Sequence, residues 1–175
     1  MTRQTIAINL NAKKQLPNLL WVLKAKSTDA NRYVLKYLNI DDMGYCCTDG
    51  RRLHLCKDKT NLPQGLENGL YEVAVTKDLI IFNPQEGNFP EYKEFIQENK
   101  EEKHKLNLYK PTSADLSIAL AEIVIKFSKC VNIDFLKDMS GYAWSVSGET
   151  EPEKPLQLNN EELLAIIMPL RMGTK

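Results

Sequence analysis

The stretch Thr48-Asp49-Gly50-Arg51-Arg52-Leu53 determines how the first third of the chain is expected to fold. An Asp-Gly pair is a strong signal for a tight hairpin turn, because glycine adopts positive φ without a steric penalty. Strand-like residues lie on both sides of the pair, at 45–48 and 53–56. The stretch therefore predicts a β-hairpin with two arginines near the strand ends, facing solvent or a partner.

The segments before this hairpin extend it into a larger unit. Residues 5–10 alternate weakly and predict a strand, after which Asn11 is a candidate helix cap. Pro17 lies in the first turns of that helix, which we expect to end at about Lys26. Residues 33–40 are rich in Tyr, Val, Leu and Ile and predict a strand. The first third thus reads as strand, helix and three-stranded meander.

The last third has the same order of elements. A short helix is expected over 134–139, followed by strands at 142–147, 156–158 and 163–168. The middle is harder to assign. We expect a hairpin at 70–75 and 79–82, and a mixed-charge solvated helix or excursion at 91–105. The segment at 114–127 fits a helix or a strand, and its alanine content favours a helix in its first half.

Composition limits the function classes. The chain has 175 residues and a mass of 20.0 kDa, enough for one ordinary domain or two very small ones. Lys and Arg number 23, as do Asp and Glu, so the formal net charge is zero and the pI is about 6.7. Wholesale electrostatic capture of nucleic acid or an anionic membrane is therefore not expected, although a local basic face is compatible with this balance.

The N-terminus lacks an apolar leader, and no run of about eighteen apolar residues occurs, so we expect a soluble cytoplasmic protein without membrane partners. Its cysteines, Cys46, Cys47, Cys56 and Cys130, are expected to be reduced. Cys46, Cys47 and Cys56 with His54 match no standard zinc spacing. A Cys–His nucleophile pair lacks an identifiable orienting group.

Enzymatic function is not expected, because the phosphate-loop, dinucleotide, nucleophile-elbow and zinc-helix motifs are absent from the sequence. We expect no cofactor and no metal. An enzyme hypothesis would rest on the cysteine cluster alone.

The second specific signal is the C-terminal stretch Ile166-Ile167-Met168-Pro169-Leu170-Arg171-Met172. Pro169 cannot donate a backbone hydrogen bond and so ends a strand or places it at a sheet edge. Met168, Leu170 and Met172 are then able to line an apolar groove.

Together, the turn and this tail resemble the bacterial DNA polymerase III beta subunit, the sliding clamp family. That family carries a Thr-Asp-Gly-x-Arg-Leu turn and a Met-Pro-x-Arg-apolar tail. Three further stretches are similar to it, at 87–92, 131–139 and 154–158. The resemblance covers roughly 5–58 and 130–172.

The resemblance implies an α+β fold: a DNA-clamp-like domain of two strand-helix-meander halves, with antiparallel sheets and helices on one face. A family member has three such domains and closes a six-domain ring as a dimer. This chain has material for about one, so we expect a shortened single-domain relative over 1–175, with an extra segment at about 60–129.

In the family, turn and tail form a hydrophobic pocket for short peptides of polymerases and clamp loaders, and Arg51 here stands where the family usually has His. A one-domain chain would complete this pocket between neighbouring subunits. By position, the peptide-binding residues would be Thr48, Gly50, Arg52, Leu53, Ile167, Met168, Pro169, Leu170 and Arg171.

Clamp rings also hold DNA through basic side chains on helices that meet phosphates without reading bases. The residues implied here are Lys13, Lys14, Lys24 and Lys137, with Lys26 and Lys129 as further lysines of the two helical segments. The resemblance thus predicts a non-enzymatic replication or repair accessory that forms a homo-oligomer around or against DNA and docks partner peptides. The alternative is a monomeric interaction adaptor with a clamp fold and no DNA binding.

Overall fold

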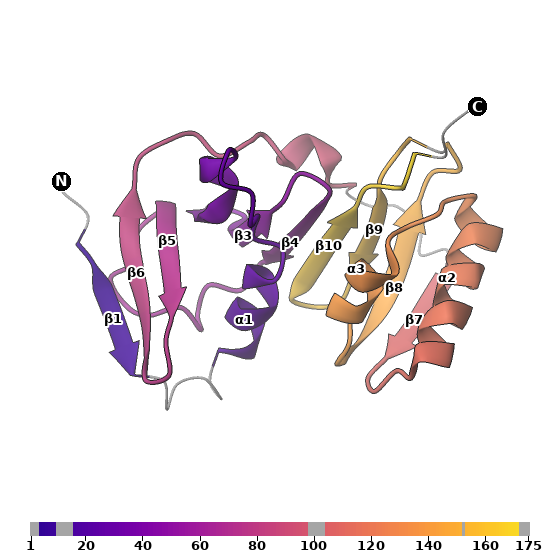
Figure 1. Ribbon diagram of the computed structural model, residues 1–175, viewed down its shortest axis with the longest axis horizontal. Coiled ribbons are helices and arrows are strands. Elements are labelled where there is room, and N and C mark those ends of the chain that lie inside the picture. The colour runs from indigo at the N-terminus through magenta and orange to yellow at the C-terminus, as the bar shows by residue number, and fades with distance from the viewer. Residues whose placement is uncertain (1–3, 10–15, 98–103, 152, 172–175) are drawn as a thin grey trace. The chain divides into compact units, whose positions relative to one another are not determined.

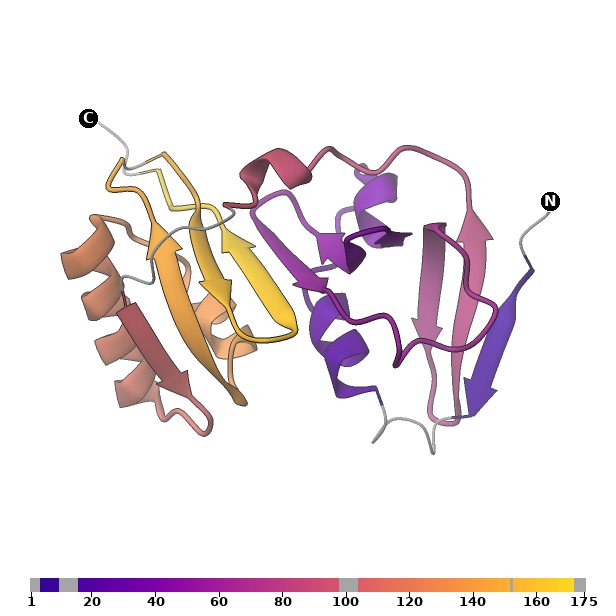
Figure 2. The ribbon, with the colours of Figure 1, turned by 180° about the vertical axis from the view of Figure 1, so that it is seen from behind.

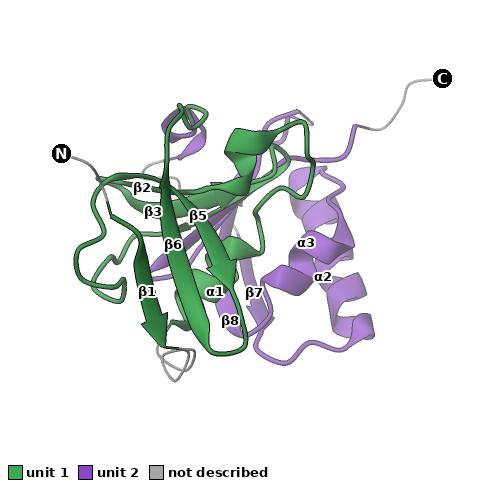
Figure 3. Cartoon of the chain, turned by 60° about the vertical axis from the view of Figure 1, so that its left-hand side comes forward, with its two compact units in different colours: residues 1–91 green, residues 92–175 purple. Residues whose placement is uncertain are grey.

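The computed structural model describes residues 4–9, 16–97, 104–151 and 153–171 (Figure 1). The chain forms two compact units, unit 1 at residues 1–91 and unit 2 at residues 92–175 (Figure 3). The boundary falls inside the stretch 87–92, one of the stretches that are similar to the sliding clamp family. Residues 60–129 contribute strands to unit 1 and a strand and a helix to unit 2.

The described residues of unit 1 form an antiparallel sheet with one α-helix and one 3-10 helix. Its elements are β1 (Ile6–Asn9), α1 (Pro17–Leu23), η2 (Tyr33–Lys36), β2 (Leu38–Asp41), β3 (Gly44–Thr48), β4 (Arg52–Cys56), β5 (Gly69–Val75) and β6 (Leu79–Gln85). The strand order is β1-β6-β5-β2-β3-β4. α1 packs against β3 and β4, which places the helix behind the Asp-Gly hairpin.

In unit 2, the part of the chain that the structure describes forms a smaller antiparallel sheet covered by two α-helices. Its elements are η3 (Lys93–Phe95), β7 (His104–Leu108), α2 (Ser113–Phe127), α3 (Ile133–Asp138), β8 (Tyr142–Gly148), β9 (Leu156–Asn159) and β10 (Leu163–Ile167). The strand order is β10-β9-β8-β7. Figures 1 and 2 show α2 and α3 on the same face of this sheet.

Both units contain, in chain order, a strand, a helical segment and a three-stranded meander, and in unit 1 the hairpin of β5 and β6 follows the meander. In unit 1 the meander is β2, β3 and β4, and in unit 2 it is β8, β9 and β10. The predicted α+β class with strand-helix-meander halves is therefore confirmed. The predicted hairpin of 70–75 with 79–82 is confirmed as well, since Val73 pairs with Phe82.

The strand predicted over 33–40 is wrong in its first half. Tyr33–Lys36 is a 3-10 helix in which the Leu35 amide donates to the Arg32 carbonyl at 3.0 Å. Tyr33 is 59% exposed, so the aromatic residue that favoured a strand is not buried against a sheet. The Leu35 carbonyl instead accepts from the Ser27 amide at 3.0 Å, which ties this turn to the start of the loop that precedes it.

α1 is shorter than the predicted helix. It begins with Pro17 as its first residue and ends at Leu23, after which i to i−3 hydrogen bonds continue to Lys26. Pro17 suits this position because the first helical amide has no partner inside a helix. The predicted cap, Asn11, lies outside the described residues.

The structure answers the two open questions about the middle of the chain, the charged segment 91–105 and the ambiguous segment 114–127. Within 91–105 the described residues form η3 and the start of β7, so a solvated α-helix over the described part of that segment is wrong. The segment 114–127 is helical throughout as α2. A capping box fixes its start, because Thr112 accepts from the Asp115 amide at 3.3 Å while Asp115 accepts from the Thr112 amide at 2.7 Å.

Candidate functional site

The hairpin turn between β3 and β4 is held by its own side chains. The Thr48 hydroxyl donates to the Arg52 carbonyl at 2.7 Å and accepts from the Gly50 amide at 3.0 Å. One Asp49 carboxylate oxygen accepts from the amides of Arg51 and Arg52 at 2.8 and 3.0 Å. Gly50 has φ of +84°, which a side chain rarely adopts. The predicted turn therefore forms, with each polar residue of the Thr-Asp-Gly triplet fixing the backbone.

Arg52 folds back onto the unit. Its guanidinium donates to the Lys24 carbonyl at 2.8 Å and lies 3.2 Å from the Asp49 carboxylate. Lys24 is the residue at the C-terminal end of α1, where backbone carbonyls lack helical partners and attract cations. Arg52 therefore joins the hairpin turn to the end of α1, whereas the neighbouring Arg51 is exposed.

Replacing Arg52 is expected to cost stability. Arg52→Ala removes two charge-assisted contacts of a side chain that is only 16% exposed, so we expect a loss of about 2 kcal/mol in the free energy of unfolding. Arg51→Ala is the matched control, and should change stability by less than about 0.5 kcal/mol. Urea denaturation measures both. Equal stability of the two variants would contradict this role for Arg52.

The predicted pocket residues of the turn differ in exposure. Thr48 and Leu53 are 8% and 5% exposed and belong to the core of unit 1. Gly50 is exposed and Arg52 half-buried. On the turn side, the surface open to a ligand therefore consists of Gly50 and Arg51 together with part of Arg52.

The tail residues lie in unit 2. Ile167 is the last residue of β10 and is fully buried, whereas Met168 and Pro169 are half-buried. Leu170 is 46% exposed, and its amide donates to the Cys130 carbonyl at 2.7 Å. Arg171 is exposed, and Met172 lies outside the described residues. This hydrogen bond holds the tail backbone to the segment before α3 while leaving an apolar side chain on the surface.

Two of the four candidate phosphate-contact lysines are described. Lys24 is exposed at the end of α1. Lys137 is exposed on α3 and lies 2.6 Å from the Asp134 carboxylate, one turn earlier. Lys13 and Lys14 lie outside the described residues.

Lys129 is not a surface lysine, contrary to its assignment to a DNA-facing helix. It is 1% exposed, and its ammonium donates to the backbone carbonyl of Glu151. Burial lowers the pKa of Lys129, and nearby acidic groups, led by Glu151, act in the opposite direction. Ser128, the left-handed residue that ends α2 with φ of 55°, redirects the chain inward at this point. Lys129 therefore anchors the loop before β9 and is not available to a phosphate.

A buried aromatic pair behind the hairpin was not recognised from the sequence. His54 of β4 stacks on Trp21 of α1 with ring centroids 4.2 Å apart, and its Nδ1 lies 3.0 Å from the Trp21 carbonyl. The His54 side chain is fully buried, and its Nε2 has no hydrogen-bond partner among the described residues. Burial lowers the pKa of His54 to about 3, so the ring is neutral at pH 7.

The cysteine cluster has the features of a packed core. Cys46, Cys47 and Cys56 are buried and Cys130 is partly exposed, and all four are free thiols. Burial raises the pKa of the Cys47 thiol, which disfavours a reactive thiolate. Within the described ranges, no group of three potential metal-ligating side chains occurs.

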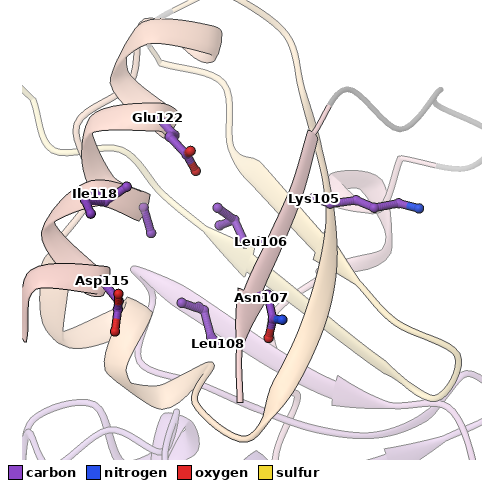
Figure 4. A pocket seen from close by; sticks show the side chains of 8 residues that line it. Lys105, Leu106, Asn107, Leu108, Asp115, Ile118 and Glu122 are labelled. Atoms are coloured by element: carbon purple, nitrogen blue, oxygen red, sulfur yellow. The ribbon is translucent and has the colours of Figure 1, made fainter. Parts of the chain in front are cut away.

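Unit 2 also carries a shallow groove of about 270 Å³ between β7 and α2 (Figure 4). Its apolar lining includes Leu106, Leu108 and Ile118, and its polar rim includes Asp115 and Glu122. Glu122 lies 2.9 Å from His104 Nε2, which links α2 to the first residue of β7. The groove is separate from every residue predicted for peptide or phosphate contact.

The repeated strand-helix-meander order defines a DNA-clamp-like fold, and solved structures agree. The chain is similar to the sliding clamp of Bartonella birtlesii bound to griselimycin, with a TM-score of 0.59 and 15% identity over 96% of this chain and 66% of that chain. It is also similar to DNA polymerase III subunit beta of Borrelia burgdorferi in complex with a natural product, with a TM-score of 0.57 and 16% identity over 97% and 63%.

A third similar structure is the beta clamp of Helicobacter pylori bound to a DNA ligase peptide, with a TM-score of 0.56 and 11% identity over 98% of this chain and 66% of that chain. At these identities the likeness establishes the fold, and it confirms the fold that the turn and tail motifs implied. The chain spans 63–66% of the length of these three structures. No protein-family model and no curated protein matches it.

None of the helices in the described part of the chain is long and apolar enough to cross a membrane.

Proposed function

We propose that this protein is a non-enzymatic, cytoplasmic, clamp-like accessory of DNA replication or repair, built as a single functional clamp domain, that self-associates around or against DNA and docks partner peptides. One observation carries the proposal: structures of bacterial sliding clamps match 96–98% of the chain at TM-scores of 0.56–0.59. The turn and tail motifs support it independently, because they match the family at positions that form its peptide pocket.

Peptide docking is assigned to the turn and the tail. Leu170 is the exposed apolar side chain of the tail, with Met168 and Pro169 half-buried beside it in the chain. Gly50 and Arg51 are the exposed residues of the turn, while Leu53 and Ile167 support the two segments from the cores of their units. The peptide carried by the Helicobacter pylori clamp is an example of the kind of partner proposed here.

Phosphate contact is assigned to Lys24 and Lys137, together with Lys13 and Lys14. A lysine that neutralises one phosphate releases condensed counterions, which makes binding steeply salt-dependent. Lys24 is the stronger described candidate because the ammonium of Lys137 is shared with Asp134.

Charge reversal at these lysines is expected to weaken DNA binding without changing base preference. Lys24→Glu should reduce the slope of log affinity against log salt by about 1, and Lys137→Glu by less, since Asp134 already offsets that charge. Lys129→Met is the matched control at a buried lysine and should leave the slope unchanged. Fluorescence anisotropy with duplex DNA measures all three. A slope that falls as much in Lys129→Met as in Lys24→Glu would contradict the assignment.

The second candidate function is a monomeric adaptor with the clamp fold and no DNA binding. The formal net charge of zero favours it, because the chain as a whole offers no excess of cations. The ion pair at Lys137 and the burial of Lys129 favour it too, since each removes a lysine from the phosphate-contact surface.

The solution mass separates the two functions. Light scattering on a size-exclusion column at low and moderate salt should show a stable closed oligomer, ideally of six chains, if the protein acts as a ring. A strict monomer at all concentrations would overturn the self-association part of the proposal and favour the adaptor.

A further inference from the structure

The outward face of α2 carries an apolar stripe. Ile118 and Ile125 are 58% and 79% exposed, and Ala114 and Ala121 are exposed between them. At 100° per residue these four side chains fall within a sector of about 60°. The opposite face of the helix holds its buried residues, Leu116, Ala119, Ile123 and Phe127. α2 is therefore apolar on both faces, and only one of them is covered within the described chain.

This stripe is unsuited to phosphate contact. The only cation in α2 is Lys126, which lies about 110° around the helix from the centre of the stripe. Val124, at 44% exposure, adds apolar surface along one flank. Ile118 also belongs to the apolar lining of the groove in Figure 4. An apolar surface of this kind on a helix fits a protein partner better than a nucleic acid.

The spacing of the stripe makes it complementary to itself. Its residues follow one another at intervals of four, three and four, which is the spacing of the residues that meet where two helices pair. They alternate between alanine and isoleucine. In an antiparallel pair with its two-fold axis between Ala119 and Leu120, Ile118 meets Ala121 of the second copy and Ala114 meets Ile125 of the second copy. Each large side chain then packs on a small one. A parallel pair would oppose alanine with alanine and leave gaps.

Charge and area agree with a second copy as the occupant. The chain has no net charge, so two copies do not repel at long range. In the same register, Lys126 of one copy and Asp115 of the other lie at nearly the same height along the helix axis, about 3 Å apart in that direction. The stripe with Val124 offers about 400 Å² of apolar surface per copy. Two such faces bury about 800 Å², which is the size of a weak, concentration-dependent contact.

We propose that α2 pairs with α2 of a second copy of this chain, antiparallel, through Ala114, Ile118, Ala121 and Ile125. This inference goes beyond the proposed function, because it assigns a surface that neither peptide docking nor phosphate contact uses. The pairing forms with or without DNA.

Sedimentation equilibrium of the full chain up to about 0.5 mM tests the pairing, since a contact of this area gives micromolar to millimolar dissociation constants. The wild-type chain should show a reversible, concentration-dependent doubling of mass, from monomer to dimer if it forms no ring and from ring to pair of rings if it does. Ile118→Glu and Ile125→Glu should each weaken it by at least about tenfold, because a carboxylate would be buried without a partner. Ser113→Glu, exposed on the same helix about 110° from the stripe, is the control and should leave it unchanged.

Ala121→Leu tests the orientation. In the antiparallel register the larger side chain collides with Ile118 of the second copy and should weaken pairing, whereas in a parallel register it would fill the alanine layer and strengthen pairing. Circular dichroism confirms that each variant remains folded. A strictly monomeric wild-type chain, undiminished association of the Ile→Glu variants, equal weakening by Ser113→Glu, or stronger association of Ala121→Leu would each overturn the proposal.

Discussion

Lowering the pH from 7 to 5 is expected to destabilise the folded chain by about 2 kcal/mol through His54 alone. The ring is fully buried, stacks on Trp21, and has a folded-state pKa of about 3 against an ordinary value of 6.5. Between these two values the unfolded chain binds a proton that the folded chain excludes. Stability is therefore fully present above pH 6.5 and is lost as the pH falls toward 3.

The loss between pH 7 and pH 3 is about 4 kcal/mol, which is comparable to the whole stability of a small domain. Carboxylates titrate mainly below pH 5, so the window from pH 7 to 5 isolates the histidine contribution. Urea denaturation at several pH values measures the slope. The chain has only two histidines, which makes the assignment tractable.

His54→Gln should remove this pH dependence, and His104→Gln is the matched control that should retain it. His104 lies in the other unit and pairs with Glu122 at the surface of α2. If His54→Gln fails to fold, the imidazole resonances of the wild-type chain answer the same question, because His54 should remain neutral at pH 5. The same pH dependence of the free energy of unfolding in the wild-type and His54→Gln chains, or a protonated His54 at pH 5, would contradict this account.

Gly44→Ala is expected to cost at least about 4 kcal/mol, enough to prevent folding of a marginally stable chain. Gly44 begins β3 with φ of +137°, and a Cβ there would lie 2.0 Å from the Cys56 carbonyl oxygen. The atoms that block it belong to the backbone of Cys56 and Lys57, so they cannot move aside without separating β3 from β4. The energy of backbone strain from the positive φ and the energy of steric overlap from the added Cβ therefore both destabilise the variant.

Gly50→Ala is the control for strain without backbone overlap. Gly50 also has positive φ, but its nearest obstacle is the tip of the flexible Arg32 side chain at 3.1 Å. We expect a cost of about 1–2 kcal/mol there. Expression yield and urea denaturation measure both variants. If Gly44→Ala were no less stable than Gly50→Ala, the close approach of β3 to β4 at Gly44 would be wrong.

Sequence reasoning succeeded where one local rule decides the structure. Asp49-Gly50 reverses the chain as turn chemistry requires, and the hairpin of 70–75 with 79–82 follows from alternation between turn signals. The resemblance carried by the turn and the tail also led to the fold that the solved structures share. These signals depend on residues that are close in the sequence, so they can be interpreted without knowledge of tertiary contacts.

Sequence reasoning failed where tertiary contacts decide. Tyr33 has high strand propensity, yet its segment closes a 3-10 turn onto Ser27. Lys129 is a surface residue by type, yet it is buried directly after the left-handed Ser128, and its ammonium donates to the Glu151 carbonyl. His54 alternates with apolar neighbours like any strand residue, and its stacking on Trp21 depends on α1 packing behind β4. None of these placements leaves a periodic signature in the sequence.

The most direct test of the central claim is the affinity of the full chain for duplex DNA as a function of salt. Lys13, Lys14 and Lys24 at phosphates, with a smaller contribution from Lys137, predict a slope of about −3 in log affinity against log salt, and hence about a sixtyfold loss between 50 and 200 mM. That result would support a clamp-like protein that holds DNA by its backbone. Absence of binding at 50 mM salt, or binding that does not change with salt, would contradict it and leave an adaptor with a clamp fold.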